Sequence, residues 1–188
     1  VLILGYGREG KSTASLFDKL GISYTVADKF EGEGVDIFGD GYQKAMDDFD
    51  IVMKSPGVVL EYTPKALILS QVELFLQYFR HNTIGITGTK GKSTTTSLIY
   101  HVLHESGVDS VIAGNIGIPP FDVAEKVEKN TVVVMELSSH QLEYAKTAPH
   151  TALYLNLYEE HLDHYGSFEK YKAAKENIYR LQMSGDLL

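Results

Sequence analysis

Two glycine-rich turns, each between a short apolar run and a helix-like stretch, constrain the fold of this chain most strongly. The turn at residues 5–10 (GYGREG) follows the apolar run 1–4, and the turn at residues 88–91 (GTKG) follows the run 83–87. A strand that enters a glycine loop and then a helix is typical of βαβ units, which form mainly parallel sheets. Two such loops on one chain therefore predict an α/β protein with two domains.

The pattern of short β-rich runs and helical stretches extends along the whole chain. The expected strands are residues 1–4, 23–27, 51–53, 83–87, 109–113, 131–136 and 151–156. The expected helices begin near Gly10, Ser70, Gly91, Phe121 and Ser167.

We expect a Rossmann-like parallel-sheet domain at residues 1–80 and the first part of a P-loop ATPase domain at residues 81–188. The boundary falls in the polar stretch 80–82, between a helix and the next strand. The chain has no initiator methionine and ends without a polar tail, so we expect it to be a piece of a longer protein. The connection 60–69 is short for another βαβ step, which leaves open whether residues are missing there.

Charge and composition exclude several classes of function. The chain has 17 Lys and Arg against 25 Asp and Glu, a formal net charge of −8. This field repels polyanions, so we expect no nucleic-acid partner and only local phosphate sites. The lack of cysteine excludes disulfides and thiolate metal sites and fits a reducing cytosol. No segment approaches the roughly 20 apolar residues of a membrane span, so we expect no membrane insertion. We further expect a cytoplasmic monomer without a targeting signal.

The second glycine loop continues through Lys92, Ser93 and Thr94 into a threonine-rich helix start. Glycines let backbone N–H groups point at an anion, and a helix N-terminus favours negative charge. Lys92 adds a cation for the β- and γ-phosphates of a nucleotide, and the Ser93 hydroxyl can bind Mg²⁺. The strict phosphate-loop pattern has a glycine where this chain has Ile86, so the loop is a variant. The alternative is a glycine turn beside a chance lysine.

The first glycine loop matches the dinucleotide-binding fingerprint, and Asp28 ends the next strand about 20 residues on. An acid at that place hydrogen-bonds a ribose, so an NAD-dependent Rossmann dehydrogenase is one hypothesis. The chain has no evident hydride-transfer site, however, and one dinucleotide does not explain the lysine-bearing second loop. Glu9 departs from the usual pattern because its carboxylate repels a diphosphate unless it turns outward.

Candidate metal ligands follow the apolar run 132–135. Glu136 ends this run, so we expect its carboxylate at the carboxyl edge of a buried strand, where open α/β sheets bind ligands. It would serve Mg²⁺ there, and the alternative is a structural N-cap for the next helix. His161, Asp163 and His164 form a polar group that is equally typical of an exposed helix start.

Lys175 lies in the stretch 167–179, which we expect to be helical. A lysine ammonium about 4 Å from Mg²⁺ would be repelled by roughly 8 kcal/mol at an effective dielectric of ~20. A lysine near the metal must therefore point away, be neutral or change the sign of its charge. By spacing alone, an exposed lysine on a solvated helix face is the more frequent case.

Five stretches together resemble the Mur ligases, the ATP-dependent amino-acid-adding enzymes of bacterial cell-wall precursor synthesis. They are residues 87–94, 114–117, 136–143, 156–165 and 171–175. The Leu-Ser-Ser-x-Gln-Leu-Glu run in the third stretch is similar to the corresponding sequence of the members that add D-glutamate to UDP-MurNAc-L-Ala. The resemblance covers nearly the whole chain. The alternatives are a ligase of the folylpolyglutamate synthase type and a nucleotide-binding fragment without activity.

The resemblance implies an enzyme that uses ATP to join D-glutamate to UDP-MurNAc-L-Ala through an acyl phosphate, in peptidoglycan synthesis. The pathway serves cell-wall biogenesis, cell shape and cell division. ATP and two Mg²⁺ ions are the implied cofactors, and the implied modification of Lys175 is a carbamate formed from CO₂. Family members carry a C-terminal domain that binds the incoming amino acid. We expect that domain to be absent here and the 188 residues to be inactive alone.

The resemblance also implies a set of residues for each role. For ATP binding they are Gly88, Thr89, Lys90, Gly91, Lys92, Ser93 and Thr94. For the metal ions they are Ser93, Glu136, His161 and Lys175, and for catalysis Lys92, Glu136, His161 and carbamylated Lys175. For substrate binding they are Gly5, Gly7, Arg8, Glu9, Gly10, Asp28, Ser55, Gly57, Asn115 and Ser138. Without the resemblance, Asn115 is equally well explained as a left-handed turn residue.

Overall fold

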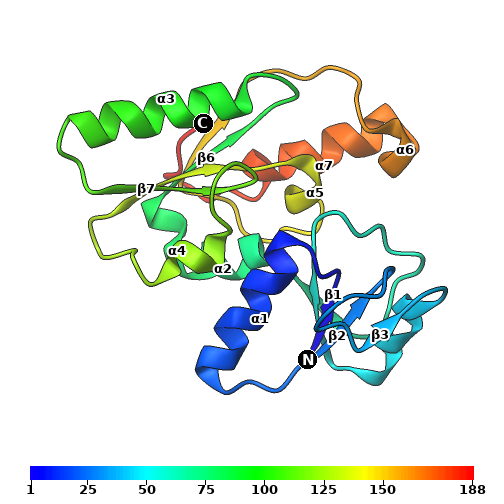
Figure 1. The fold of residues 1–188 in the computed structure, drawn as a ribbon. Coiled ribbons are helices and arrows are strands. Elements are labelled where there is room, and N and C mark those ends of the chain that lie inside the picture. Colours follow the sequence, from blue (N-terminus) through cyan, green and yellow to red (C-terminus); the bar gives the residue numbers. More distant parts are fainter. The chain divides into compact units, whose positions relative to one another are not determined.

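The computed structural model describes residues 1–188, which divide into two compact units, Val1–Gln71 and Val72–Leu188. Each unit contains one open parallel β-sheet with helices packed against it (Figure 1). The expected α/β class is therefore confirmed. The division lies nine residues before the boundary expected at residue 80, because Val72, Phe75 and Leu76 belong to the core of the second unit.

The sheet of the first unit has the strand order β3-β2-β1-β4-β5, and its neighbouring strands are parallel. Its elements are β1 (Leu2–Leu4), α1 (Arg8–Leu20), β2 (Thr25–Asp28), β3 (Ile37–Phe38), a 3₁₀ helix (Tyr42–Asp48), β4 (Ile51–Lys54) and β5 (Leu67–Leu69). The buried core consists of Leu2, Leu4, Ala27, Met46 and Val52 with Ala45. Because these side chains come from three adjacent strands and the 3₁₀ helix, burying them fixes the centre of the sheet.

The turn between β1 and α1 is tight because glycine occupies two crowded positions. Gly5 has φ 90°, and Ser55 Oγ donates a hydrogen bond to its carbonyl oxygen at 2.7 Å. A Cβ on Gly10 would lie 2.1 Å from that same oxygen, so no larger residue fits there. A Cβ on Gly7 would meet no atom within 4 Å. The outer side of the loop, where Gly7 lies, is therefore open.

The sheet of the second unit has the strand order β7-β8-β6-β9 and is also parallel. Its elements are α2 (Gln71–Phe79), of which the first residue belongs to the first unit, a 3₁₀ helix (Arg80–Asn82), β6 (Thr83–Thr87), α3 (Lys92–Glu105), β7 (Ser110–Gly114), α4 (Pro120–Ala124), β8 (Val132–Glu136), α5 (Ser139–Leu142), β9 (Thr151–Tyr154), α6 (Leu162–Tyr165) and α7 (Phe168–Arg180). Val133, Met135, Leu137 and Ile178 pack with α2 in its core. None of the helices in either unit has the length and apolar character needed to cross a membrane.

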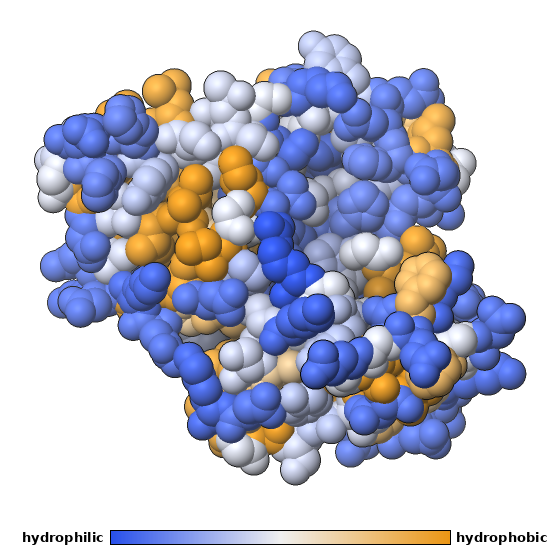
Figure 2. Space-filling view, in the orientation of Figure 1, coloured by the Kyte–Doolittle hydropathy of each residue, from blue (hydrophilic) through white to orange (hydrophobic).

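Strands β6, β8 and β9 bring distant parts of the sequence to one edge of the second sheet. Ile86 pairs with Glu136, and Thr87 pairs with Tyr154. Because the strands are parallel, the segments that follow them begin at the same edge. Near the outer strand β7, on the opposite side of the strand order from β9, hydrophobic side chains gather on the visible surface (Figure 2).

Every expected strand and helix forms, with ends that move by at most two residues. The structure adds the short strands β3 and β5 and the short helices α5 and α6. The connection between β4 and β5, residues 55–66, contains no helix. An irregular crossover therefore joins these two parallel strands.

Candidate active site

The glycine loop of the second unit joins β6 to α3. Gly88 has φ 153°, and a Cβ on it would lie 3.1 Å from Leu155 Cβ, so close packing favours glycine. Gly91 has φ 81° and directly precedes α3. No side chain caps this helix, and Thr95 N donates to Gly91 O in its first backbone bond. The N–H groups of the first turn are therefore available to an anion.

Lys92, Ser93 and Thr94 form the start of α3. The Lys92 ammonium donates to the Thr89 carbonyl oxygen at 3.0 Å, so this side chain folds back over the loop. Ser93 and Thr94 are exposed. The structure thus places a lysine, two hydroxyl groups and a helix N-terminus together, which is the arrangement that the sequence pattern indicates for a nucleotide.

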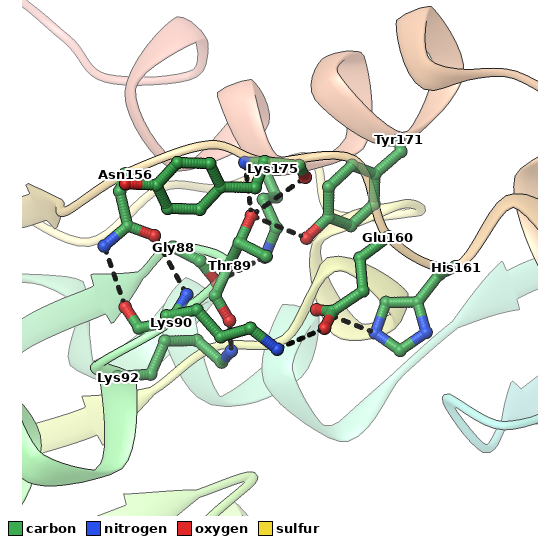
Figure 3. Close-up of polar contacts among 10 residues, drawn as sticks. Gly88, Thr89, Lys90, Lys92, Asn156, Glu160, His161, Tyr171 and Lys175 are labelled. Carbon is green, nitrogen blue, oxygen red and sulfur yellow. Dashed lines mark hydrogen bonds and ion pairs between the residues drawn. The ribbon is translucent and has the colours of Figure 1, made fainter.

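The segment that follows β9 holds the loop from a second side (Figure 3). Thr89 N donates to Asn156 O at 3.0 Å, and Lys90 N donates to Asn156 Oδ1 at 2.9 Å. Thr89 Oγ1 accepts a bond from Tyr158 N at 2.9 Å and lies 3.0 Å from Tyr171 Oη. The first half of the loop is therefore fixed by hydrogen bonds within the second unit.

An ion pair links the loop to Glu160. Its partner is the Lys90 ammonium, and the other Glu160 oxygen lies 3.8 Å from His161 Nε2. The hydrogen bond to Lys90 lowers the pKa of Glu160, and it raises the pKa of Lys90. The Lys90 side chain is 69% exposed, so solvent screens this pair. Its clearer effect is to place a carboxylate beside the loop.

Three imidazole rings lie near one another after β8 and β9. The His140 ring centre is 4.9 Å from that of His161 and 4.3 Å from that of His164. The His164 side chain is only 8% exposed, and its Nε2 lies 2.9 Å from Glu143 Oε2. His164 is therefore not an exposed residue of the helix start, whereas His161 and Asp163 are exposed.

Lys175 is a buried residue of α7, which excludes the alternative of an exposed lysine that spacing alone favoured. It is 2% exposed, and its ammonium donates to Gly88 O at 2.7 Å. The same nitrogen lies 5.0 Å from the centre of the Tyr171 ring. Burial, and to a lesser degree the charge of Lys92, lowers the pKa of Lys175 to about 8. A cation that is costly to bury thus lies in direct contact with the glycine loop.

Glu136 ends β8 with a buried carboxylate, at 1% exposure. Its Oε1 accepts a hydrogen bond from Asn115 Nδ2 at 2.6 Å, and its Oε2 is buried without a hydrogen-bond partner. Asn115 N also donates to Glu136 O at 3.0 Å. A buried carboxylate oxygen without a partner is costly, so it indicates a ligand such as a cation. Asn115, expected to contact substrate, supports this carboxylate.

The donor set for a metal ion is only partly assembled. The structure contains no group of three or more His, Asp or Glu side chains that could hold a metal ion. The unpartnered Glu136 oxygen fits a divalent cation, whereas the Lys175 ammonium does not. Ser93 and His161 lie at the starts of α3 and α6. The residues present therefore supply one clear carboxylate oxygen for Mg²⁺.

In the first unit, Asp28 holds the glycine loop. Its Oδ2 accepts a hydrogen bond from Tyr6 N at 2.6 Å, and its Oδ1 accepts one from Phe30 N at 3.0 Å. Arg8 and Glu9 begin α1, and Gly57 is exposed in the turn after Ser55. Asp28 therefore has a structural role in the loop, and the substrate contact expected of it remains a prediction.

Ser138 is the N-cap of α5. Its hydroxyl oxygen accepts a bond from Gln141 N at 3.2 Å, and Ser138 N donates to Gln141 Oε1 at 3.0 Å. These two bonds form a capping box, which accounts for both residues without a ligand. The substrate contact expected of Ser138 remains a prediction.

Sequence reasoning did not single out Asn156, Glu160 or Tyr171, although each lies within a stretch that carries the family resemblance. Asn156 and Glu160 follow the end of β9. Polar residues after a strand that neighbours a glycine-loop strand are the signal that would have found them. Tyr171 precedes Lys175 by one helical turn on α7, so the two side chains share a face.

The parallel sheet and the glycine loop between β6 and α3 define the second unit as an α/β domain of the phosphate-loop type. Residues 86–187 match the family description "Mur ligase middle domain". The chain therefore belongs to the Mur ligase family.

Two relatives and one solved structure show the extent of this likeness. The chain is 34% identical to a UDP-N-acetylmuramoylalanine–D-glutamate ligase from Clostridium botulinum strain Hall, over all of this chain and 45% of that protein. It is 38% identical to the ligase of the same name from Streptococcus agalactiae, over all of this chain and 46% of that protein. The chain thus spans about half the length of these relatives. A UDP-N-acetylmuramate:L-alanyl-gamma-D-glutamyl-meso-diaminopimelate ligase from Neisseria has the same fold, with a TM-score of 0.59 at 17% identity, over 99% of this chain and 69% of that one.

Proposed function

We propose that the chain is part of a ligase that uses ATP to add D-glutamate to UDP-MurNAc-L-Ala. The observation that carries the proposal is the glycine loop before α3 beside a buried Glu136 oxygen that lacks a partner. The identity of 34% and 38% to two ligases of that name supports the choice of substrates. Because the chain covers 45% of the first of them, the complete activity belongs to a longer protein.

In the second unit, residues 88–94, which are the glycine loop and the first turn of α3, form the site for the phosphates of ATP. The free N–H groups at the start of α3 and the Lys92 ammonium offset the negative charge that grows on the transferred phosphoryl group. The substrate carboxylate attacks the γ-phosphorus, ADP leaves, and the resulting acyl phosphate is attacked by the amine of D-glutamate with loss of phosphate and a proton. Mg²⁺, when bound, neutralises phosphate charge, and Glu136, Ser93 and His161 are the residues that would hold it.

Lys175 takes part as a carbamate. Its lowered pKa leaves more of the amine neutral near pH 7 than in an ordinary lysine. The neutral amine adds to CO₂ and releases one proton, which converts a cation into a carboxylate-like anion. This change removes the repulsion between an ammonium and a metal ion and adds oxygen donors to a site where few acidic side chains gather.

The first unit binds the UDP-sugar. The outer side of the loop at Gly7 leaves room for a diphosphate, which the N–H groups at the start of α1 and Arg8 would contact. Gly5 and Gly10 shape this loop, Asp28 is the last residue of β2, and Ser55 and Gly57 follow the end of β4. In the second unit, Asn115 and Ser138 are the further residues that we propose for substrate binding. Cytoplasmic location and a monomeric state are further parts of the proposal.

The test is substrate-dependent phosphate release by the chain extended to the length of its relatives. We expect release only when ATP, UDP-MurNAc-L-Ala and D-glutamate are all present, and none from the 188-residue chain. We also expect UDP-MurNAc-L-Ala to protect the 188-residue chain against thermal unfolding in a saturable way. Protection by NADH or folate in its place would contradict the proposal, as would turnover by the short chain.

A further inference from the structure

The hydrogen-bond ladder between β6 and β9 continues past the ends of both strands into the glycine loop. β6 ends at Thr87 and β9 at Tyr154. Beyond them, Leu155 N donates to Thr87 O at 3.0 Å, and Thr89 N donates to Asn156 O at 3.0 Å. The first part of the loop is therefore paired like an extension of the sheet.

The Asn156 side chain adds the last rung of this extended ladder (Figure 3). Lys90 N donates to Asn156 Oδ1 at 2.9 Å, and Asn156 Nδ2 donates to Lys90 O at 3.0 Å. One side-chain amide thus bonds both main-chain groups of Lys90, as a neighbouring strand would.

Helix α7 also holds the same part of the loop. Tyr171 Oη lies 3.0 Å from Thr89 Oγ1, and both residues are buried. At Gly88 the loop packs closely against the segment that follows β9, because a Cβ there would lie 3.1 Å from Leu155 Cβ and 3.3 Å from Asn156 N. The loop therefore has two halves: residues 88–90 are fixed, whereas the amides that open α3, at residues 91–93, have no cap.

We infer that Asn156 is a positioning residue that locks residues 88–90, so that only the amides of residues 91–93 meet a bound phosphate. Because the proposal needs a phosphate ligand for the loop, it rests on the proposed function. It also connects the glycine loop with Glu160 and His161, because these two residues lie in the segment that begins at Asn156. A phosphate that moved the fixed half would have to break the bonds that hold this segment.

The experiment uses backbone NMR of the 188-residue chain with ADP and Mg²⁺ as the probe. In the free protein, we expect the Thr89 and Lys90 amides to exchange slowly with solvent. On titration, the amide signals of Gly91, Lys92 and Ser93 should shift more than those of Thr89 and Lys90.

The variant Asn156→Ala should expose the Lys90 amide to exchange and weaken ADP binding by about tenfold, the loss expected for the ordering of one loop hydrogen bond. Asn156→Asp keeps an acceptor for Lys90 N and should restore protection of that amide. Asn82→Ala is the matched control, because Asn82 Nδ2 bonds the carbonyl oxygens of Glu128 and Thr131 at the opposite end of β6. It should lower stability and leave ADP binding unchanged.

Three results would overturn the inference: larger shifts at Thr89 and Lys90 than at residues 91–93, unchanged ADP binding by Asn156→Ala, or failure of Asn156→Asp to protect Lys90. These results differ from a failure of the proposed function, in which the wild-type chain shows no shift anywhere in the loop. The protection of the Thr89 and Lys90 amides in the free protein still tests the lock in that case.

Discussion

At the scale of single residues, buried Lys175 places the strongest demand on the second unit. Its ammonium has one hydrogen-bond acceptor at 2.7 Å, Gly88 O, and the Tyr171 ring at 5.0 Å. These contacts do not replace the water that a buried cation loses, which is why its pKa falls to about 8. Loss of a proton from this ammonium would remove the cost of burying its positive charge.

The lowered pKa of Lys175 predicts a stability that rises with pH. Between about pH 8 and the ordinary lysine value of 10.5, the unfolded chain holds this proton and the folded chain does not. The free energy of unfolding should therefore increase over that window, by up to about 1.4 kcal/mol per pH unit. Urea unfolding at about pH 8, 8.7 and 9.4, values that run from the folded pKa toward the ordinary lysine value, measures the slope. Lys175→Met should flatten it, and an equal slope in both proteins would show that Lys175 is not its source.

At the scale of elements, the close approach of the start of α1 to the end of β1 depends on Gly10. A Cβ there would lie 2.1 Å from Gly5 O, so Gly10→Ala should cost about 3 kcal/mol of stability in the first unit. Gly7→Ala is the matched control, because no atom lies within 4 Å of its Cβ and φ is −73°. It should cost at most about 1 kcal/mol, as alanine is a poor N-cap. Urea unfolding, followed by the NMR signals of β1, compares the stability of the two variants. Equal losses of stability would show that the close approach at Gly10 does not constrain the loop.

The elements that the sequence predicted share one property, which is that their signals are local. Apolar runs and nearby glycines marked β6, α3 and β8 to within two residues. The strands β3 and β5 contain only two and three residues, so they carry too little pattern to be recognised and form through their neighbours. The spacing Ser138-x-x-Gln141 is typical of a capping box, which the structure contains. The family resemblance implied a substrate contact for Ser138 instead.

The candidate site was predictable only in part, because its key contacts join residues far apart in the chain. Glu136 was expected at the end of a strand and lies there. The buried Lys175 ammonium bonds Gly88 O, 87 residues away, and the main chain of Lys90 bonds the Asn156 side chain, 66 residues away. Spacing within a motif cannot show such contacts, since they arise only when β6, β9 and α7 pack together.

At the scale of the whole molecule, the two units have separate cores, which predicts where the chain can be divided. Val72, Phe75 and Leu76 of α2 are buried in the core of the second unit. A fragment of residues 72–188 should therefore unfold cooperatively. A fragment of residues 81–188 loses three buried side chains and should be much less stable, since each large one contributes about 2–5 kcal/mol. Circular dichroism during urea unfolding measures this difference. Equal midpoints would show that α2 does not belong to the second unit.

The central claim concerns the same unit: its glycine loop binds a nucleotide through Lys92, with Mg²⁺ held by Glu136. Isothermal titration of the chain with a non-hydrolysable ATP analogue, with and without Mg²⁺, tests this most directly. The account predicts saturable binding at one site, weakened about tenfold or more by Lys92→Met, and Mg²⁺ dependence that disappears in Glu136→Gln, which keeps the shape of the side chain and loses its charge. Binding that is equally strong in both variants, or no binding by the wild-type chain, would contradict it.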